Sequence, residues 1–166
     1  GADFNEAIYH CDGVSAVRYP RGNQLFKPFD FESSCKAYDI YGEKNAEIVI
    51  VTYGRLFSFA CKALSALKGN GIPVRIVKLN RIKPIDLDAV SDAGKASKVF
   101  FFEEGIQQGG VGEHFDYLLT QSGFPNKFYL RGITDFVPHA TMMQSLEALE
   151  LDDKGMVNMI MTEYKK

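Results

Sequence analysis

The sequence has little of what membrane, secreted and nucleic-acid-binding proteins depend on. No apolar run approaches the roughly 20 residues of a membrane-spanning helix. Residues 1–20 contain neither a basic leader nor the apolar core of a signal peptide. The formal net charge is only −2, so the chain as a whole does not attract nucleic acid or an anionic membrane. We therefore expect a cytoplasmic protein without nucleic-acid or membrane partners.

Cysteine is also scarce, and its placement argues against a covalent or metal-bound scaffold. Cys11, Cys35 and Cys61 are odd in number, far apart and outside any CxxC or His-paired spacing. A disulfide framework and a zinc site both need paired, closely spaced ligands. We expect reduced thiols with a mostly structural role.

Apolar runs and amphipathic stretches alternate beyond residue 37, in a chain of 166 residues that is long enough for one sizeable core. Strands are expected at 38–41, 48–51, 72–80, 98–105 and 126–133, and helices within 55–71, 86–94, 108–123 and, as two short pieces, 141–166. The first two strands flank Gly42–Asn45 as in a hairpin. This order predicts a three-layer α/β fold with a mostly parallel sheet, helices on both faces and one antiparallel edge strand.

The first 37 residues differ from the rest in their pattern. Residues 14–19 alternate weakly, which predicts a short strand ended by Pro20 and Gly22. Residues 23–37 lose all periodicity and are too long for an ordinary connection. We therefore expect three parts: the tail of a preceding domain at 1–22, an interdomain linker at 23–37 and a domain at 38–166.

The stretch "FEEGIQQGGVGEH" joins an expected strand to an expected helix through a turn rich in glycine. Its glycines are Gly105, Gly109, Gly110 and Gly112, and they match neither GxGxxG nor the P-loop pattern. A nucleotide site is therefore disfavoured against a turn that packs a helix closely on the sheet. Glu103 and Glu104 stand where open α/β sheets place functional groups, but a carboxylate that accepts backbone N–H bonds is the favoured interpretation.

The histidines do not indicate a catalytic triad, because His10, His114 and His139 are scattered and none has an identifiable serine or cysteine partner. The aromatic run Phe100–Phe102 has the spacing of a core strand. Neither feature predicts a catalytic or cofactor site.

The stretch "RYPRG" is of another kind. Arg18 and Arg21 flank a stiff Tyr-Pro pair, and Gly22 allows close approach of the backbone. Two guanidinium groups in this arrangement suit fork-like binding of a phosphate or carboxylate. A salt-bridged pair at a domain edge explains the same residues equally well.

Several of these motifs occur together in one enzyme family. "AVRYPRG", then Lys83, Pro84 and Asp86, "EEG" with "GGVG" at 103–112, "GITDFVPHAT" at 132–141 and "LDDKG" at 151–155 follow one another over nearly the whole chain. In this order they resemble the 1-deoxy-D-xylulose 5-phosphate synthases. The "EEG" and "GGVG" element alone is similar in transketolases and in the beta subunits of 2-oxo acid dehydrogenases.

The resemblance implies a cytoplasmic, homodimeric thiamine-diphosphate transferase that condenses pyruvate with glyceraldehyde 3-phosphate for isoprenoid and thiamine precursor synthesis. It also implies that this sequence is the third domain, a transketolase C-terminal domain with a five-stranded mixed sheet, preceded by the tail of the pyrimidine-binding domain. Thiamine diphosphate and magnesium belong to the first two domains of such an enzyme. No GDG-type motif is present, so we expect no catalytic, cofactor-binding or metal-binding residue in this sequence, and no activity without the preceding domains.

By the same resemblance, Arg21 holds the phosphate of glyceraldehyde 3-phosphate and Arg18 supports it. Two alternatives remain open at this point. One is a free-standing interaction or regulatory module that docks through its sheet edge or the "GGVG" turn. The other is the C-terminal domain of a transketolase or of a 2-oxo acid dehydrogenase beta subunit, which would change the substrates but not the fold.

Overall fold

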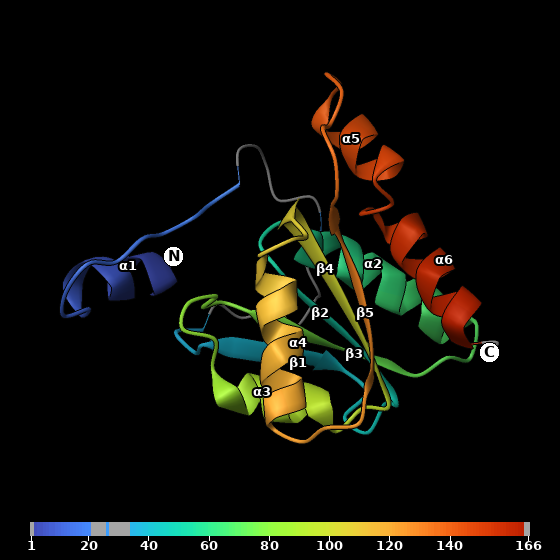
Figure 1. Cartoon of the computed structure of the whole chain (residues 1–166), viewed down its shortest axis with the longest axis horizontal. Helices are drawn as coiled ribbons and strands as arrows, with labels where there is room; N and C mark the ends of the chain where they lie inside the picture. Colours follow the sequence, from blue (N-terminus) through green and yellow to red (C-terminus); the bar gives the residue numbers. More distant parts are fainter. Residues whose placement is uncertain (1, 21–25, 27–33, 165–166) are drawn as a thin grey trace.

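A five-stranded sheet forms the centre of the computed structural model, which describes residues 2–20, 26 and 34–164. The strands are β1 (Tyr38–Gly42), β2 (Ile48–Tyr53), β3 (Val74–Leu79), β4 (Lys98–Ile106) and β5 (Lys127–Ile133), in the order β1-β3-β2-β4-β5 (Figure 1). β2 runs parallel to β3 and β4, and β4 runs parallel to β5. β1 is antiparallel to β3. The expected mostly parallel sheet with one antiparallel edge strand is confirmed.

Helices cover both faces of this sheet (Figure 1). α2 (Leu56–Gly69) and α6 (Asp153–Tyr164) pack on one face, where α5 (Met142–Ala148) adds Leu146 to the core. α3 (Leu87–Gly94) and α4 (Val111–Gln121) pack on the other. β4 serves both layers, because Phe100 and Phe102 enter the first core while Phe101 enters the second. The aromatic run is therefore core, as its spacing predicts.

The helix ends follow the signals in the sequence. Asp86 precedes α3, and its side chain accepts a hydrogen bond from the backbone N–H of Asp88 (2.8 Å). Thr141 and Gln144 form a reciprocal capping box at the start of α5. Asp152 accepts from the backbone N–H of Gly155 (2.9 Å), which confirms the expected cap of α6.

The expected hairpin between the first two strands is wrong. β1 pairs with β3, in register Ile40 to Val77, and not with β2. β2 is buried except at its last residue, Tyr53, and takes parallel neighbours on both sides, whereas β1 is half exposed and suits the edge. The chain turns away at Gly42, where φ is +89° and a Cβ would collide with the carbonyl oxygen of Val74. Glycine is needed at this crossing.

The strand expected at 14–19 is also wrong. Residues 14–20 lie outside regular secondary structure and pair with no strand of the described sheet. A short helix that the sequence did not predict, α1 (Ala2–Tyr9), precedes them, and the Ser15 hydroxyl donates to the carbonyl of Ala7 (2.8 Å). A weak alternation gives a strand only where a neighbouring strand supplies hydrogen bonds, and residues 14–20 have no such neighbour among the described residues.

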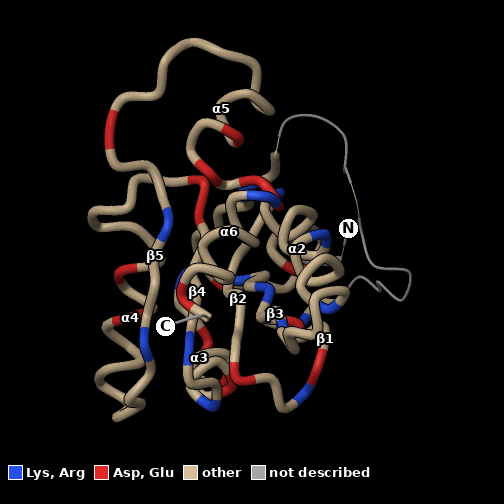
Figure 2. The backbone as a smooth tube through the Cα atoms, turned by 90° about the vertical axis from the view of Figure 1, so that its right-hand side faces the viewer, with Lys and Arg blue, Asp and Glu red and all other residues tan. Residues whose placement is uncertain are grey.

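Basic and acidic residues are interspersed over the helices and strands of the described backbone (Figure 2). Among these same residues no helix is both long and apolar enough to cross a membrane.

The junction between α5 and α6 requires a glycine at position 155. Glu150 follows the C-cap of α5 and adopts the left-handed region with φ of 53°, and the N–H of Leu151 donates to the carbonyl of Leu146 (2.8 Å). A Cβ on Gly155 would lie 2.6 Å from the Cα of Glu150, so the backbone would have to move.

We expect Gly155→Ala to lower the free energy of unfolding by about 1–3 kcal/mol, as overpacking does. Gly69→Ala is the matched control, because this helical glycine has open space around it. It should leave the protein equally stable or raise its stability by up to about 1 kcal/mol. Urea unfolding of the two variants provides the comparison, and equal midpoints would contradict this account of the junction.

Candidate functional site

The carboxyl ends of β2 and β4 bring four polar side chains to one edge of the sheet, here called the carboxyl edge. Tyr53 ends β2 and Arg55 precedes α2, while Glu103 and Glu104 lie near the end of β4. In open α/β sheets this edge is where ligands usually bind. Glu103 is only 1% exposed, which makes it the most deeply buried charged group of the set.

Glu103 is satisfied by three donors of the protein itself. Its Oε2 accepts from the Tyr53 hydroxyl (3.1 Å) and from the N–H of Val111 (3.0 Å), and its Oε1 accepts from the N–H of Gly112 (3.2 Å). Burial raises the pKa of Glu103, while the hydrogen bonds from Gly112, Tyr53 and Val111 act against the rise. The carboxylate caps the first turn of α4 and organises the loop, as expected.

The glycine-rich turn is shaped around this carboxylate. A Cβ on Gly110 would lie 2.5 Å from Oε1 of Glu103, and one on Gly112 would lie 3.0 Å from the same atom and would collide with Leu130. Glycine at these positions lets α4 pack directly on the sheet. The expected packing turn is confirmed.

The pKa of Tyr53 is shifted by the same buried surroundings. Burial raises the pKa of its hydroxyl, and the neighbouring Glu103 carboxylate raises it further. The positive charge of Arg18 acts on this hydroxyl in the opposite direction. Arg18 is exposed, yet its positive charge acts to lower the pKa of Tyr53 at the carboxyl edge.

Arg55 and Glu104 form an ion pair beside this network. Nε of Arg55 lies 2.9 Å from Oε2 of Glu104, without the alignment of a hydrogen bond. The pair joins the start of α2 to the end of β4 and forms the polar end of a groove that continues toward α5. Glu104 is thus an ion-pairing residue, unlike its buried neighbour.

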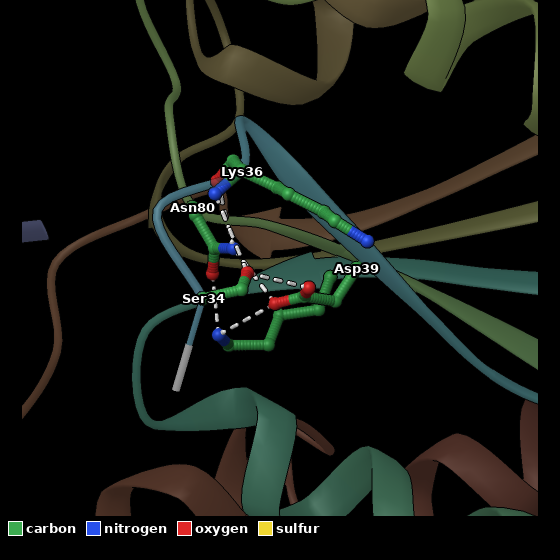
Figure 3. Close-up of polar contacts among 5 residues, drawn as sticks. Ser34, Lys36, Asp39 and Asn80 are labelled. Atoms are coloured by element: carbon green, nitrogen blue, oxygen red, sulfur yellow. Dashed lines mark hydrogen bonds and ion pairs between the residues drawn. The ribbon is translucent and has the colours of Figure 1, made fainter. Parts of the chain in front are cut away.

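A second polar group, here called the entry cluster, fixes the chain where it enters the sheet (Figure 3). Asp39 accepts from the Ser34 hydroxyl (2.7 Å) and from the Asn80 amide (2.7 Å). The Asn80 amide also donates to the carbonyl of Lys36 (3.1 Å), and the Lys78 ammonium lies 3.6 Å from Asp39. The cluster ties residues 34–36 to the carboxyl end of β3.

Two arginines were predicted to contact a substrate. Arg18 is exposed in the structure, and Arg21 lies outside the described residues. The histidines, from which no site was predicted, lie far apart in the sequence. His10 directly follows α1, and His139 is exposed in the loop before α5. His114 in α4 stacks on Tyr117, with ring centroids 6.2 Å apart. These histidines stand on three separate elements. The described residues contain no group of His, Cys, Asp and Glu side chains that could hold a metal ion.

Comparison with known proteins identifies the family. Residues 38–156 match the family described as "Transketolase, C-terminal domain". The chain belongs to this family. A curated 1-deoxy-D-xylulose-5-phosphate synthase of Azobacteroides pseudotrichonymphae is 28% identical to this chain. The alignment covers 93% of this chain and 25% of that synthase. A synthase of the same name from Haemophilus influenzae is 30% identical over 95% of this chain and 25% of its own length.

A solved structure described as "Split gene transketolase, inactive beta4 tetramer" has a similar fold. It superimposes with a TM-score of 0.71 at 23% identity, over 83% of this chain and 45% of that chain. The chain spans about a quarter of the length of the curated relatives it matches. The resemblance drawn from the motifs is therefore confirmed: this transketolase C-terminal domain is homologous to the synthases.

Sequence reasoning missed Tyr53 and Arg55. Both follow the apolar run of β2 in "IVIVTYGR", so the rule that found Glu103 at the end of β4 also applied to them. Their partners are about 50 residues away in the chain, and the register of β2 beside β4 was not known. The entry cluster was missed for the same reason.

We expect Glu103→Gln to lower the free energy of unfolding by about 1–3 kcal/mol, because the amide nitrogen that replaces one carboxyl oxygen cannot accept a hydrogen bond from the donors around it. The folded state raises the pKa of Glu103 above its ordinary 4.5, so the folded protein binds this proton more tightly than the unfolded chain. The stability contributed by this group is therefore complete below pH 4.5 and declines as the pH rises through the folded value.

In denaturant unfolding, the difference in unfolding free energy between the parent protein and Glu103→Gln should accordingly narrow as the pH rises above 4.5. Glu147→Gln on exposed α5 is the control and should stay within about 0.5 kcal/mol of the parent at every pH. A gap that widens with pH would show a depressed pKa and contradict the assignment.

Proposed function

We propose that this chain forms the C-terminal part of a 1-deoxy-D-xylulose 5-phosphate synthase and has a structural and assembly role there. The observation that carries the proposal is the coverage of the curated relatives: synthases of this name align with 93–95% of this chain, while it spans 25% of each. The complete enzyme condenses pyruvate with glyceraldehyde 3-phosphate and releases carbon dioxide. It acts as a homodimer in the cytoplasm, and this part alone is inactive.

The proposed division of the chain has three parts. Residues 1–22 are the tail of the pyrimidine-binding domain, residues 23–37 are a linker and residues 38–166 are the transketolase C-terminal domain. The family match beginning at residue 38 supports the second boundary. The lack of any sheet pairing by residues 2–20 supports their assignment to another domain.

The described residues do not fit thiamine diphosphate and magnesium. A diphosphate group would need the free N–H groups at the start of α4, but the carboxylate of Glu103 already accepts from Val111 and Gly112. A second anion there would be repelled by Glu103. The described residues also lack a carboxylate cluster of the kind that binds magnesium. In the proposed enzyme the cofactor and metal sites belong to the preceding domains.

The proposed substrate contact is Arg21, which would clamp the phosphate of glyceraldehyde 3-phosphate with Arg18 in support. A guanidinium fork matches the geometry of a phosphate dianion. The opposing effect of the Arg18 charge on the pKa of Tyr53 supports a position of this segment toward the carboxyl edge. Arg18 is exposed, so its guanidinium is accessible to a ligand.

The test is the steady-state kinetics of Arg21→Ala in the complete synthase polypeptide. Loss of charge-assisted hydrogen bonds should raise KM for glyceraldehyde 3-phosphate about tenfold to a hundredfold and leave KM for pyruvate nearly unchanged. Arg81→Ala, an exposed arginine after β3, is the matched control and should change neither. Equal effects on both substrates would remove the role of Arg21, and a parent enzyme without synthase activity would overturn the proposed function.

A further inference from the structure

Exposed apolar side chains gather at the carboxyl edge beyond β4 and β5. Ile106 is 69% exposed and Phe136 is 84% exposed, and Met142 and Met143 in the first turn of α5 are also exposed. In Figure 1, α5 stands over the carboxyl ends of these two strands. An apolar patch of this kind on a water-soluble surface usually marks a contact with another protein part.

A groove joins this patch to the Arg55–Glu104 ion pair. Its lining is mostly apolar and includes Ile133, Val137, Met142 and Leu146. The groove encloses about 480 Å³ between the sheet edge and α5. It has an apolar wall and one charged end, a combination that favours a side chain or helix of another polypeptide segment.

The chain that precedes the sheet is tethered to this same edge. The Ser58 hydroxyl in the first turn of α2 donates to the carbonyl of Phe26 (2.6 Å). Pro20 stands six residues before Phe26, so the two lie at most about 20 Å apart. The entry cluster holds residues 34–36 at the end of β3, on the same edge. A domain that precedes Pro20 in the polypeptide is therefore attached within about 20 Å of the point where Phe26 is bound at the carboxyl edge.

The segment before Pro20 has apolar side chains of its own that lie open to water. Tyr9 and Tyr19 are mostly exposed, and Val14 is fully exposed. Both the segment and the patch thus present uncovered apolar surface, and Pro20 lies at most about 20 Å from Phe26, whose carbonyl is bound at the carboxyl edge. A single body that covers both would bury them together.

We propose that the carboxyl-edge surface formed by Ile106, Phe136, Met142, Met143 and the adjoining groove is the docking site for the domain that precedes residue 20 in the same polypeptide. This inference rests on the proposed function, which supplies that domain. The tether favours this occupant over a second copy, because a short link gives the attached domain an effective concentration in the millimolar range.

The test is photo-crosslinking in the complete synthase polypeptide, with p-benzoylphenylalanine in place of Phe136. We expect crosslinks within one chain to peptides from before residue 20, identified by mass spectrometry. Tyr117 on α4 is the matched control, because it is an aromatic residue 57% exposed on a helix away from the carboxyl edge. The same substitution at Tyr117 should give at least tenfold less of the crosslinked product.

Crosslinks between two chains, or equal yields at the two positions, would overturn the docking site. Activity with pyruvate and glyceraldehyde 3-phosphate is measured on the unsubstituted enzyme. An active enzyme without the expected crosslink overturns the docking site and leaves the proposed function standing. An inactive enzyme with the expected crosslink overturns the proposed function and leaves the docking site standing.

Discussion

The arrangement of this domain at its carboxyl edge depends on one buried carboxylate. Glu103 ends the buried part of β4 and accepts hydrogen bonds from the start of α4 and from Tyr53 of β2. Three elements are thereby fixed around one charged group that water does not reach. The cost of burying the charge is offset only while all three donors are present. The turn has glycine at positions 110 and 112 because a larger side chain at either position would displace the Glu103 carboxylate from its donors.

Local signals predicted the elements but not their neighbours. A few consecutive residues were enough to predict three features that the structure confirms. These are the cap at Asp86, the apolar run Phe100–Phe102 and the break before α6. The hairpin failed because the choice of partner for β1 depends on β3, which the chain reaches only after α2. The strand expected at 14–19 failed because a strand needs a neighbour, which a sequence pattern cannot supply.

The candidate site shows the same division. Glu103 was found because it ends a recognisable strand, and its capping role followed from the glycines nearby. Tyr53 and Arg55 were missed because their partners lie on another strand, about 50 residues away. The family resemblance predicted more than the local patterns did, because it compares motifs along the whole chain and needs no knowledge of the contacts between them. It assigned the chain to homologues of the synthases, but it could not say how the Glu103 carboxylate fills the turn.

The Glu103 carboxylate already accepts hydrogen bonds from the two N–H groups at the start of α4, so neither is free for a phosphate. The most direct measurement is a titration of this chain with thiamine diphosphate and magnesium, followed through the backbone amide resonances of Val111 and Gly112. Because Glu103 occupies both N–H groups, these resonances should move no more than they do with sodium chloride of equal ionic strength. Saturable shifts at these two amides would contradict the account.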